Sequence, residues 1–432
     1  MFQDLPSKWE LKRLASVTKD IKSGFASGKR DDNGIVQLRM NNVDIGGKIN
    51  LEKTLKVPIP QNIEDYLLQN GDVLFNNTNS VDLIGKTSIF NDEIIPCTYS
   101  NHLTRIRGDS TKVNQKWILY NLISLWKKGI FFRICNRHVG QAGITSKDID
   151  NLRIPVPPLV EQRGIVEVLG TVDECIRLTD AVIERAEELK RGLIQRLLTR
   201  GIGHTEYKKT PIGNMPKKWD LLSIGDIADV KGGKRLPKGH KFVEGTSKHP
   251  YIRVIDMKNG EVEPYQLKYL SDETFNIIKR YIINIQDVYI SIAGTIGLCG
   301  IISRELDGAN LTENAAKITN IKNILPQFLS YYLNSPLGQK QIKSLTGQTS
   351  QPKLALFRIR KIRVPIPHNN EQEKILEIFT NIDKKIETEK SMEKNLISLK
   401  KGLMQLLLSG NIRVELKGDG LHRIGDGREA NN

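Results

Sequence analysis

The chain repeats itself with an offset of 210 residues, and this repeat limits its possible folds more than any other feature. The openings "LPSKWELKRLASV" and "MPKKWDLLSIGDI" align Trp9 with Trp219. Further on, "LRIPVPPLVEQRGIVEVLGTVDECI" (152–176) aligns with "IRVPIPHNNEQEKILEIFTNIDKKI" (362–386), and "LKRGLIQRLLTRGI" (189–202) aligns with "LKKGLMQLLLSGNI" (399–412). Between these ends the halves diverge. A fixed-period repeat predicts two equivalent structural units. Similar ends around dissimilar middles are typical of one scaffold that holds two different recognition surfaces.

A long helix is predicted in each half. The proline-rich segments 155–158 and 365–367 disfavour helix, and Glu161 and Glu371 open long stretches without proline. Each predicted helix has about 40 residues and a length of ~60 Å. In the first, a heptad seam runs through Ile165, Leu169, Val172, Ile176, Thr179, Ile183, Ala186, Leu193 and Leu197, with a gap at Lys190. In the second it runs through Ile375, Phe379, Ile382, Ile386, Leu396, Leu403 and Leu407, with Glu389 and Glu393 interrupting its centre. One such stretch is more often an amphipathic helix of a globule, whereas two matching copies favour two helices that pack on each other.

The balance of charge indicates the kind of partner. The 432 residues include 65 Lys and Arg against 49 Asp and Glu, a net charge of +16. Such an excess favours a polyanion, with nucleic acid ahead of a membrane surface. The first predicted helix holds eight acids and six bases, and the second holds seven of each. The positive excess therefore belongs mainly to the two regions between the repeated ends.

Nothing at the start of the chain resembles a secretion signal. The longest apolar run, Val288–Ile302, is broken by three glycines and is shorter than the ~20 residues that a membrane-spanning helix needs. Four cysteines (Cys97, Cys135, Cys175 and Cys299) lie far apart without a CxxC pair. We therefore expect a cytoplasmic protein without a disulfide framework.

These residues resemble a known family, the specificity subunit of type I restriction-modification enzymes. The resemblance covers nearly the whole chain and rests on the "LPSKW" and "MPKKW" openings, the "IPVPPLVEQ" and "VPIPHNNEQ" junctions, the helix after each, and the "KRGLIQRLL" and "KKGLMQLLL" closings. It implies an α/β (α+β) fold with two target recognition domains, each of which reads one half of a split, asymmetric DNA site. An antiparallel pair of helices would separate them and dock two methyltransferase subunits, with restriction subunits joining through the complex. Catalysis would reside in those partner chains.

The repeat and the resemblance together predict five segments. These are a first target recognition domain (1–160), a first spacer helix (161–200), a second recognition domain (201–370), a second spacer helix (371–412) and a flexible tail (413–432). The tail is predicted flexible because it is rich in glycine and charge and matches nothing in the first half.

Motifs for chemistry within this chain are incomplete. "SVDLIGKT" (80–87) has Ser80 where a phosphate-binding loop needs its first glycine, and "GFASGKR" (24–30) has too short a spacing. No GxGxxG follows a strand, no Asn-Pro-Pro-Tyr of the methyltransferase type is present, and the Cys135/His138 pair lacks two further zinc ligands. We therefore expect a non-catalytic subunit without a cofactor or metal.

Polar residues near turns are the candidates for contacts with DNA, since Asn can pair with adenine, Lys and Arg suit guanine or phosphate, and Glu can accept from cytosine. In the first domain they are Asn76, Asn77, Thr78, Ser80, Lys86, Asn101, His102 and Arg105. In the second they are Ser291, Thr295, Asn310, Thr312, Glu313, Asn314, Gln348, Gln351 and Lys353. Family members often have a basic residue after the strand that ends at Phe75, whereas this chain has Asn76, which leaves phosphate anchoring there open. Each residue alone is more often a turn-capping or solvated side chain.

Two other functions remain open from the sequence. A coiled-coil scaffold that binds protein partners would show weak, sequence-blind binding to DNA. A nuclease or methyltransferase would turn over substrate as a purified chain, with a metal or a methyl donor.

Overall fold

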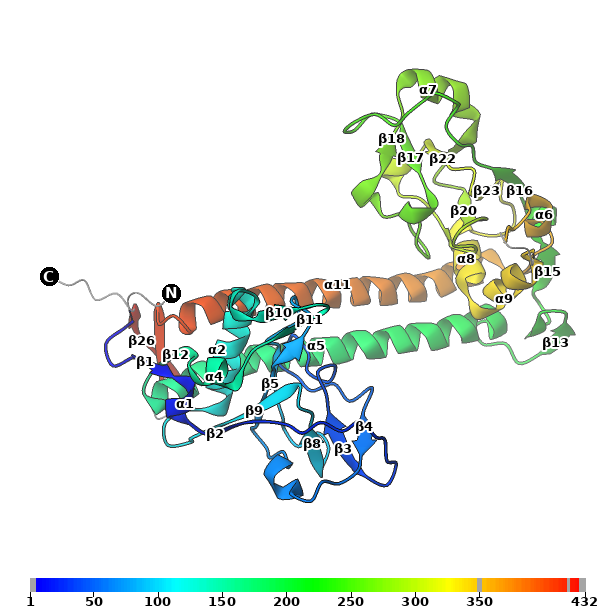
Figure 1. Ribbon diagram of the computed structural model, residues 1–432. Coiled ribbons are helices and arrows are strands. Elements are labelled where there is room, and N and C mark those ends of the chain that lie inside the picture. Colours follow the sequence, from blue (N-terminus) through cyan, green and yellow to red (C-terminus); the bar gives the residue numbers. More distant parts are fainter. Residues whose placement is uncertain (1–4, 348–351, 418–419, 427–432) are drawn as a thin grey trace. The chain divides into compact units, whose positions relative to one another are not determined.

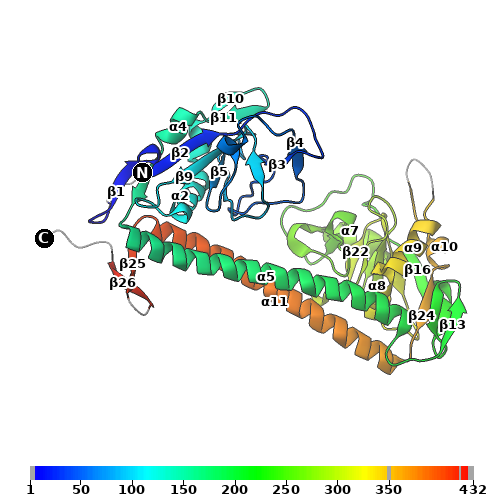
Figure 2. The same ribbon diagram turned by 90° about the horizontal axis from the view of Figure 1, so that it is seen from below.

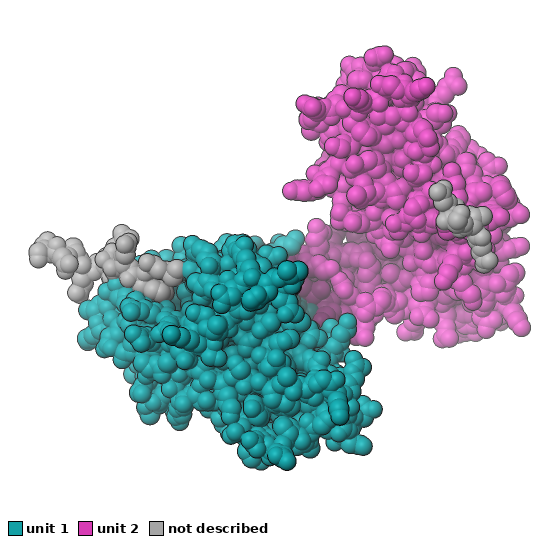
Figure 3. Space-filling model, in the orientation of Figure 1, with its two compact units in different colours: residues 1–180, 391–432 teal, residues 181–390 magenta. Residues whose placement is uncertain are grey.

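The computed structural model describes residues 5–347, 352–417 and 420–426, and the chain divides into two compact units. Unit 1 consists of residues 1–180 and 391–432, and unit 2 consists of residues 181–390 (Figure 3). The long helices α5 (Leu159–Arg200) and α11 (Asn369–Leu407) each begin in one unit and end in the other. Each unit therefore contains the first part of one long helix and the last part of the other.

The described residues of unit 1 form five small sheets and several short helices in front of its part of the helical pair (Figures 1 and 2). Its strands are β1 (Glu10–Arg13), β2 (Thr18–Ser23), β3 (Ile35–Leu38), β4 (Leu55–Val57), β5 (Val73–Asn76), β6 (Thr78–Asn79), β7 (Thr87–Ile89), β8 (Cys97–Tyr99), β9 (Leu103–Gly108), β10 (Asn136–His138), β11 (Gln141–Gly143), β12 (Arg153–Val156), β25 (Ile412–Lys417) and β26 (Gly420–Asp426). Its shorter helices are α1 (Leu14–Val17), η1 (Ile63–Tyr66), α2 (Gln115–Lys127), α3 (Ile130–Ile134) and α4 (Ser146–Asp150).

Unit 2 is built in the same way around the other ends of the two long helices. Its strands are β13 (Tyr207–Thr210), β14 (Gly213–Pro216), β15 (Asp220–Ser223), β16 (Asp229–Gly232), β17 (Pro250–Ile252), β18 (Lys268–Tyr269), β19 (Ile282–Ile283), β20 (Val288–Ser291), β21 (Cys299–Gly300), β22 (Ala309–Leu311), β23 (Ala315–Thr319) and β24 (Arg363–Ile366). Its shorter helices are α6 (Ile224–Ile227), η2 (Val254–Asp256), η3 (Pro264–Gln266), α7 (Asp272–Ile278), η4 (Lys279–Tyr281), η5 (Arg304–Leu306), α8 (Pro326–Asn334), α9 (Pro336–Leu345) and α10 (Leu356–Ile359).

The sheets of the two units share one topology, although the sequences that form them diverge. A four-stranded antiparallel sheet has the order β2-β9-β5-β7 in unit 1 and β16-β23-β20-β21 in unit 2. In a second sheet, β3 pairs antiparallel with β4 and parallel with β8, and β17 pairs in the same two ways with β18 and β22. The duplication therefore extends through the divergent middles of both halves.

The repeated ends close each unit at equivalent residues. β1 pairs with β12 so that Glu10 faces Val156, and β15 pairs with β24 so that Asp220 faces Ile366. Both pairs are antiparallel, and every partner in one pair is offset by 210 residues from its counterpart in the other. The strands bring the start of each recognition domain next to the residues that lead into its long helix.

A tryptophan fixes the start of each long helix. The Nε1 of Trp9 donates to the Oε2 of Glu161 at 3.0 Å, and the Nε1 of Trp219 donates to the Oε2 of Glu371 at 2.9 Å. A basic side chain that follows the other helix completes each group. Arg413 binds Glu161 through Nε at 3.0 Å and through Nη2 at 2.9 Å, whereas the Nε2 of His204 lies 2.9 Å from Oε1 of Glu371.

The glutamine that follows each of these glutamates makes three equivalent hydrogen bonds. The Oε1 of Gln162 accepts from the backbone of Asn114 at 2.8 Å, and its Nε2 donates to the carbonyls of Lys112 and Pro157. The Oε1 of Gln372 accepts from the backbone of Leu325 at 2.8 Å, and its Nε2 donates to the carbonyls of Asn323 and Pro367. Both side chains are fully buried. This explains why the Glu-Gln pair recurs in a chain whose halves differ elsewhere.

Apolar and charged contacts join the helices within each unit. In unit 1, Ile165 and Leu169 of α5 share a core with Met404 and Leu407 of α11. In unit 2, Leu197 of α5 shares a core with residues of α11 that include Ile375 and Phe379. Because early residues of one helix meet late residues of the other, the pair is antiparallel, as predicted.

The gap in the predicted seam is an interhelical ion pair. Lys190 of α5 pairs with Asp383 of α11 in unit 2, and Lys400 of α11 pairs with Asp173 of α5 at 2.5 Å in unit 1. Both partners are offset by 210 residues. A lysine on this face therefore provides a charged contact between the helices where a heptad seam would have an apolar residue.

The structure confirms the predicted fold class, with two duplicated α/β domains and two long antiparallel helices. α5 and α11 begin two residues before the predicted spacer helices, at Leu159 and Asn369, and α11 ends at Leu407, before the predicted end at 412. The tail is expected to be flexible from residue 413, but the structure pairs β25 with β26 as an antiparallel hairpin that begins at Ile412. The rest of the predicted five-part division stays a prediction. Among the described residues, no helix combines the length and the apolar character needed to cross a membrane.

Candidate nucleic-acid interface

The predicted residues of the first domain gather where β5 and β9 lie side by side. Asn76 faces Leu103 across this pair, and the Nδ2 of Asn77 donates to the carbonyl of Asn101 at 3.1 Å and to the Oγ1 of Thr104 at 2.8 Å. The amides of Asn76 and Asn77 are buried. They hold the turn after β5 against the turn before β9, so their role within the unit is to position neighbouring residues.

Lys86 and Arg105, two predicted cations, are also buried and bind inside unit 1. The Nζ of Lys86 donates to the carbonyl of Val43 at 2.7 Å, and burial lowers its pKa against the opposing effect of the Asp44 charge. Arg105 forms an ion pair with Asp20 and donates from Nη1 to the carbonyls of Asp65 and Leu67. Both side chains cross-link loops of the domain.

The other predicted residues of unit 1 are accessible. Ser80 and Asn101 are exposed, and Thr78 and His102 are half-buried. The hydroxyl of Thr78 donates to the Oδ1 of Asn77 at 2.8 Å, so the accessible residues rest on the buried ones. The structure thus brings residues 76–80 and 101–105 together. Their solvent-accessible side chains lie on the outside of this cluster.

Three predicted residues in unit 2 are buried. The Oγ of Ser291 donates to the carbonyl of Thr295 at 2.6 Å and accepts from the backbone of Leu298 at 2.8 Å, which closes the turn after β20. The Nδ2 of Asn310 donates to the carbonyl of Ile278 at 2.9 Å. The Oγ1 of Thr312 donates to the Oε2 of Glu313 at 3.0 Å. The Oδ1 atoms of Asn76 and Asn310 have no hydrogen-bond partner among the described residues.

Accessible residues of unit 2 also cluster. Thr295, Asn314 and Lys353 are exposed, and Glu313 is half-buried beside Arg235, whose Nε lies 3.3 Å from its Oε1. The carbonyl of Asn314 accepts from the backbone of Ile292 at 2.8 Å, and Lys353 pairs with Ala293 in a β-bridge. The 291–295, 312–314 and 353 segments therefore meet, whereas Asn310 lies in the other sheet. Gln348 and Gln351 lie outside the described residues.

Two segments without acidic residues carry the positive charge of the chain. Residues 110–147 contain seven Lys and Arg and no Asp or Glu, and residues 314–370 contain nine and none. Together they hold sixteen positive charges, which equals the net charge of the whole chain, so the remaining residues are neutral on balance. The absence of acidic residues over these two segments is visible in the sequence. The prediction of DNA contacts from single polar residues did not use it.

Each acid-free segment belongs to one unit and lies in the later part of its predicted recognition domain. The first contains α2, α3, β10 and β11, and the second contains β23, α8, α9, α10 and β24. Each also presents an exposed aromatic ring beside a cation. The Arg137 guanidinium lies 4.6 Å from the centre of the Phe132 ring, and Lys361 lies 5.8 Å from that of Phe357. A basic surface of this kind attracts phosphates.

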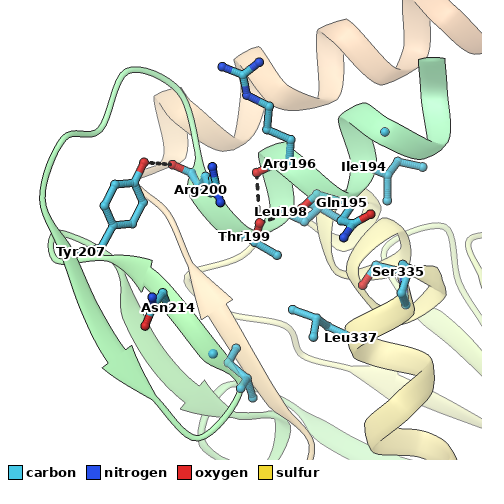
Figure 4. A pocket seen from close by; sticks show the side chains of 14 residues that line it. Ile194, Gln195, Arg196, Leu198, Thr199, Arg200, Tyr207, Asn214, Ser335 and Leu337 are labelled. Atoms are coloured by element: carbon cyan, nitrogen blue, oxygen red, sulfur yellow. Dashed lines mark hydrogen bonds between the residues drawn. The ribbon is translucent and has the colours of Figure 1, made fainter.

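A separate pocket of about 810 Å³ lies in unit 2, at the end of α5. Ile194, Leu198, Arg196 and Arg200 of that helix line it with residues of the β13–β14 hairpin and the start of α9. In Figure 4, Tyr207 points its hydroxyl toward the Arg200 carbonyl at one side, and Leu337 lies at the other. None of the predicted DNA-contacting residues that the structure describes lines this pocket.

Two α/β domains of one topology on an antiparallel helical pair define a class of duplicated, two-domain protein. Residues 6–188 and 216–398 each match the family described as the type I restriction modification DNA specificity domain. The chain therefore belongs to the family of type I restriction-modification specificity subunits.

Related proteins match over nearly the full chain. The putative type I restriction enzyme MjaX specificity subunit of Methanocaldococcus jannaschii is 28% identical over 426 residues, which cover 95% of each chain. The EcoKI specificity subunit of Escherichia coli is 21% identical over 432 residues, covering 95% of this chain and 90% of that protein. The crystal structure of the type I restriction-modification S subunit from M. genitalium aligns with a TM-score of 0.55 at 17% identity over 94% of this chain and 96% of that one. The structural likeness shows a shared fold.

Proposed function

We propose that this chain reads a bipartite, asymmetric DNA sequence and directs methyltransferase and restriction subunits to it. The observation that carries the proposal is the pair of acid-free basic segments, one in each of two units with the same scaffold. Equivalent scaffolds with different surfaces suit two half-sites of different sequence. A scaffold that binds only proteins has no need of a positive excess confined to the two variable domains.

Within this proposal the accessible residues meet DNA and the buried ones position them. In unit 1 the contacts come from Thr78, Ser80, Asn101 and His102, held by Asn76, Asn77, Lys86 and Arg105. In unit 2 they come from Thr295, Glu313, Asn314 and Lys353, held by Ser291, Asn310 and Thr312. Gln348 and Gln351 remain further candidates. Asn and Glu can read base edges, whereas a lysine neutralises phosphate.

Methyltransferase subunits would dock on the long helices through apolar residues that the helical pair leaves exposed. Val182 and Leu189 of α5 are 41% and 57% exposed, and Met392 and Leu399 of α11 are 53% and 51% exposed. Each residue of the first pair is offset by 210 from one of the second. Equivalent exposed patches suit two copies of the same partner, and restriction subunits would join through them.

Single substitutions that introduce a charge test this docking. Leu189→Glu is expected to reduce the number of bound methyltransferase subunits from two to one, and Leu399→Glu to do the same, as measured by native mass spectrometry of the complex. Glu184→Lys changes the charge of an exposed neighbour and serves as the control. Two bound subunits in all three variants would exclude the proposed patches.

The chemistry would then belong to the partners, in the cytoplasm where they meet DNA. Lys86, in the segment that comes nearest to a phosphate-binding loop, supports this division because backbone carbonyls of its own domain occupy its ammonium group.

Mapping of methylated bases tests the proposed function. DNA from cells that carry this chain with its methyltransferase partner is expected to be methylated at one split motif, with two different half-sites and a fixed gap. Methylation at a single contiguous motif, or none, would overturn the proposal.

A further inference from the structure

The β10–β11 hairpin of unit 1 lies within an acid-free segment, and its outer part, beyond the pairing of β11 with β6, is an exposed two-stranded ribbon. Asn136 pairs with Gly143, Arg137 with Ala142 and His138 with Gln141. Val139 and Gly140 form the two-residue turn, where Gly140 has a φ of 79°. Val139 is completely exposed, and a Cβ added at Gly140 would meet nothing within 4 Å. The tip therefore projects away from its own domain.

The two faces of the ribbon differ in character. Paired residues of an antiparallel ribbon share a face, and neighbours along a strand alternate between faces. Ala142 is buried in the core of unit 1, so its face packs on the domain. The opposite face carries Asn136, His138 and Gln141, all three exposed. β11 also pairs with β6, where Gly143 faces Thr78, so Thr78 extends the same polar face.

The surroundings of the ribbon are positive. Seven Lys and Arg accompany no acidic residue between 110 and 147, and Arg137 lies on the ribbon itself. The Arg137 guanidinium stacks on Phe132 and donates to its carbonyl at 3.4 Å, which fixes the cation at the base of the hairpin. A polyanion is the partner that this charge fits.

We propose that this hairpin enters the major groove of duplex DNA and reads bases of one half-site with Asn136, His138 and Gln141. The inference rests on the proposed function and adds a reading element to it. The major groove is ~12 Å wide and admits a two-stranded ribbon, and its base edges present the donors and acceptors that amide and imidazole groups match. Gln141 pairs with adenine, Val139 contacts a thymine methyl group, and Arg137 binds phosphate.

Gln141→Glu is the most informative variant, because it keeps the size of the side chain and removes its donors. A glutamate accepts from cytosine N4, whereas glutamine pairs with adenine. The expected result is a change of preferred base at one position of one half-site. Asn136→Ala and His138→Ala are expected to relax one position each by about 5- to 150-fold. Gln61→Ala, at an exposed glutamine in a loop outside the acid-free segment, is the control.

The readout is the methylation map of the full chain with its methyltransferase partner, together with the urea midpoint of each purified variant. An altered half-site beside an unchanged second half-site and an unchanged midpoint supports the inference. If all the hairpin variants keep the wild-type motif, the hairpin does not read DNA, although the proposed function stands. If the wild-type chain directs no motif, both fail. A variant that loses methylation and whose urea midpoint also falls has lost its fold, and the test then rests on Gln141→Glu, which preserves the shape of the side chain. A changed base preference in Gln141→Glu supports the inference, and an unchanged motif overturns it.

Discussion

Arg413→Met is expected to destabilise unit 1 selectively, although Arg413 lies beyond both long helices in the sequence. The Glu161 side chain is 3% exposed and that of Arg413 is 16% exposed, and two hydrogen bonds of 3.0 and 2.9 Å join them. Removal of one partner from a buried ion pair costs about 3–5 kcal/mol, because the remaining charge stays buried. Among the described residues, Trp9 is then the one remaining side-chain donor to Glu161.

Hydrogen–deuterium exchange measures this effect unit by unit. The amides of β1 and β12 in unit 1 are expected to lose at least about 150-fold of their protection, which corresponds to about 3 kcal/mol. Those of β15 and β24 in unit 2 should not change, since His204 completes the equivalent group there. In the control Glu161→Gln/Arg413→Met, the neutral amide still accepts from Trp9, and most of the protection should return. A loss below about 1 kcal/mol, or an equal loss in both units, would show that the Arg413–Glu161 ion pair does not stabilise unit 1 in this way.

Three other results are expected. Binding of DNA should weaken with salt by ~0.9 log units per log salt for each phosphate contact, so Arg137→Ala should reduce that slope by about one contact, and an unchanged slope would exclude Arg137 from phosphate. One heptad inserted near Thr179 and one near Glu389 lengthens both helices by ~10 Å and keeps the seam, so the gap in the methylated motif should grow by about three base pairs while both half-sites stay. An unchanged gap would show that the length of the helices does not set the distance between the half-sites. The purified chain should show no nuclease, ATPase or methyl-transfer activity, and metal-dependent cleavage by clean protein would contradict this.

The repeat predicted most of the scaffold because its physical causes are local and occur twice. A heptad seam and a proline-rich junction before a Glu-Gln pair are visible in the sequence, and both copies lead to the same contacts in the structure. Lys190 interrupted the predicted seam because its partner, Asp383, lies in the other half of the chain. The hairpin after α11 was missed for a related reason, since the composition of the tail says nothing of its strand pairing or of the contact between Arg413 and Glu161.

The candidate interface was harder to predict because polarity along a sequence does not reveal burial. Asn76 and Asn310 lie in strands and look accessible beside turns, yet both are fully buried and hydrogen-bonded inside their units. The β10–β11 hairpin is short and follows a helix, so no alternation of apolar residues marks it. The absence of acids over 110–147 was the available signal, and it becomes informative once the structure shows which of those residues are exposed.

Exchange of one recognition domain for a copy of the other tests whether each domain reads its own half-site. The 210-residue offset allows residues 14–151 to replace residues 224–361 with equal length and with the β15–β24 closure intact. The methylation map of cells that carry the exchanged chain with the methyltransferase partner should show two inverted copies of the first half-site. This is expected because each domain reads its own half and the helices are antiparallel. Persistence of the second half-site would show that residues outside the exchanged domain read it, and that the two domains do not each read their own half.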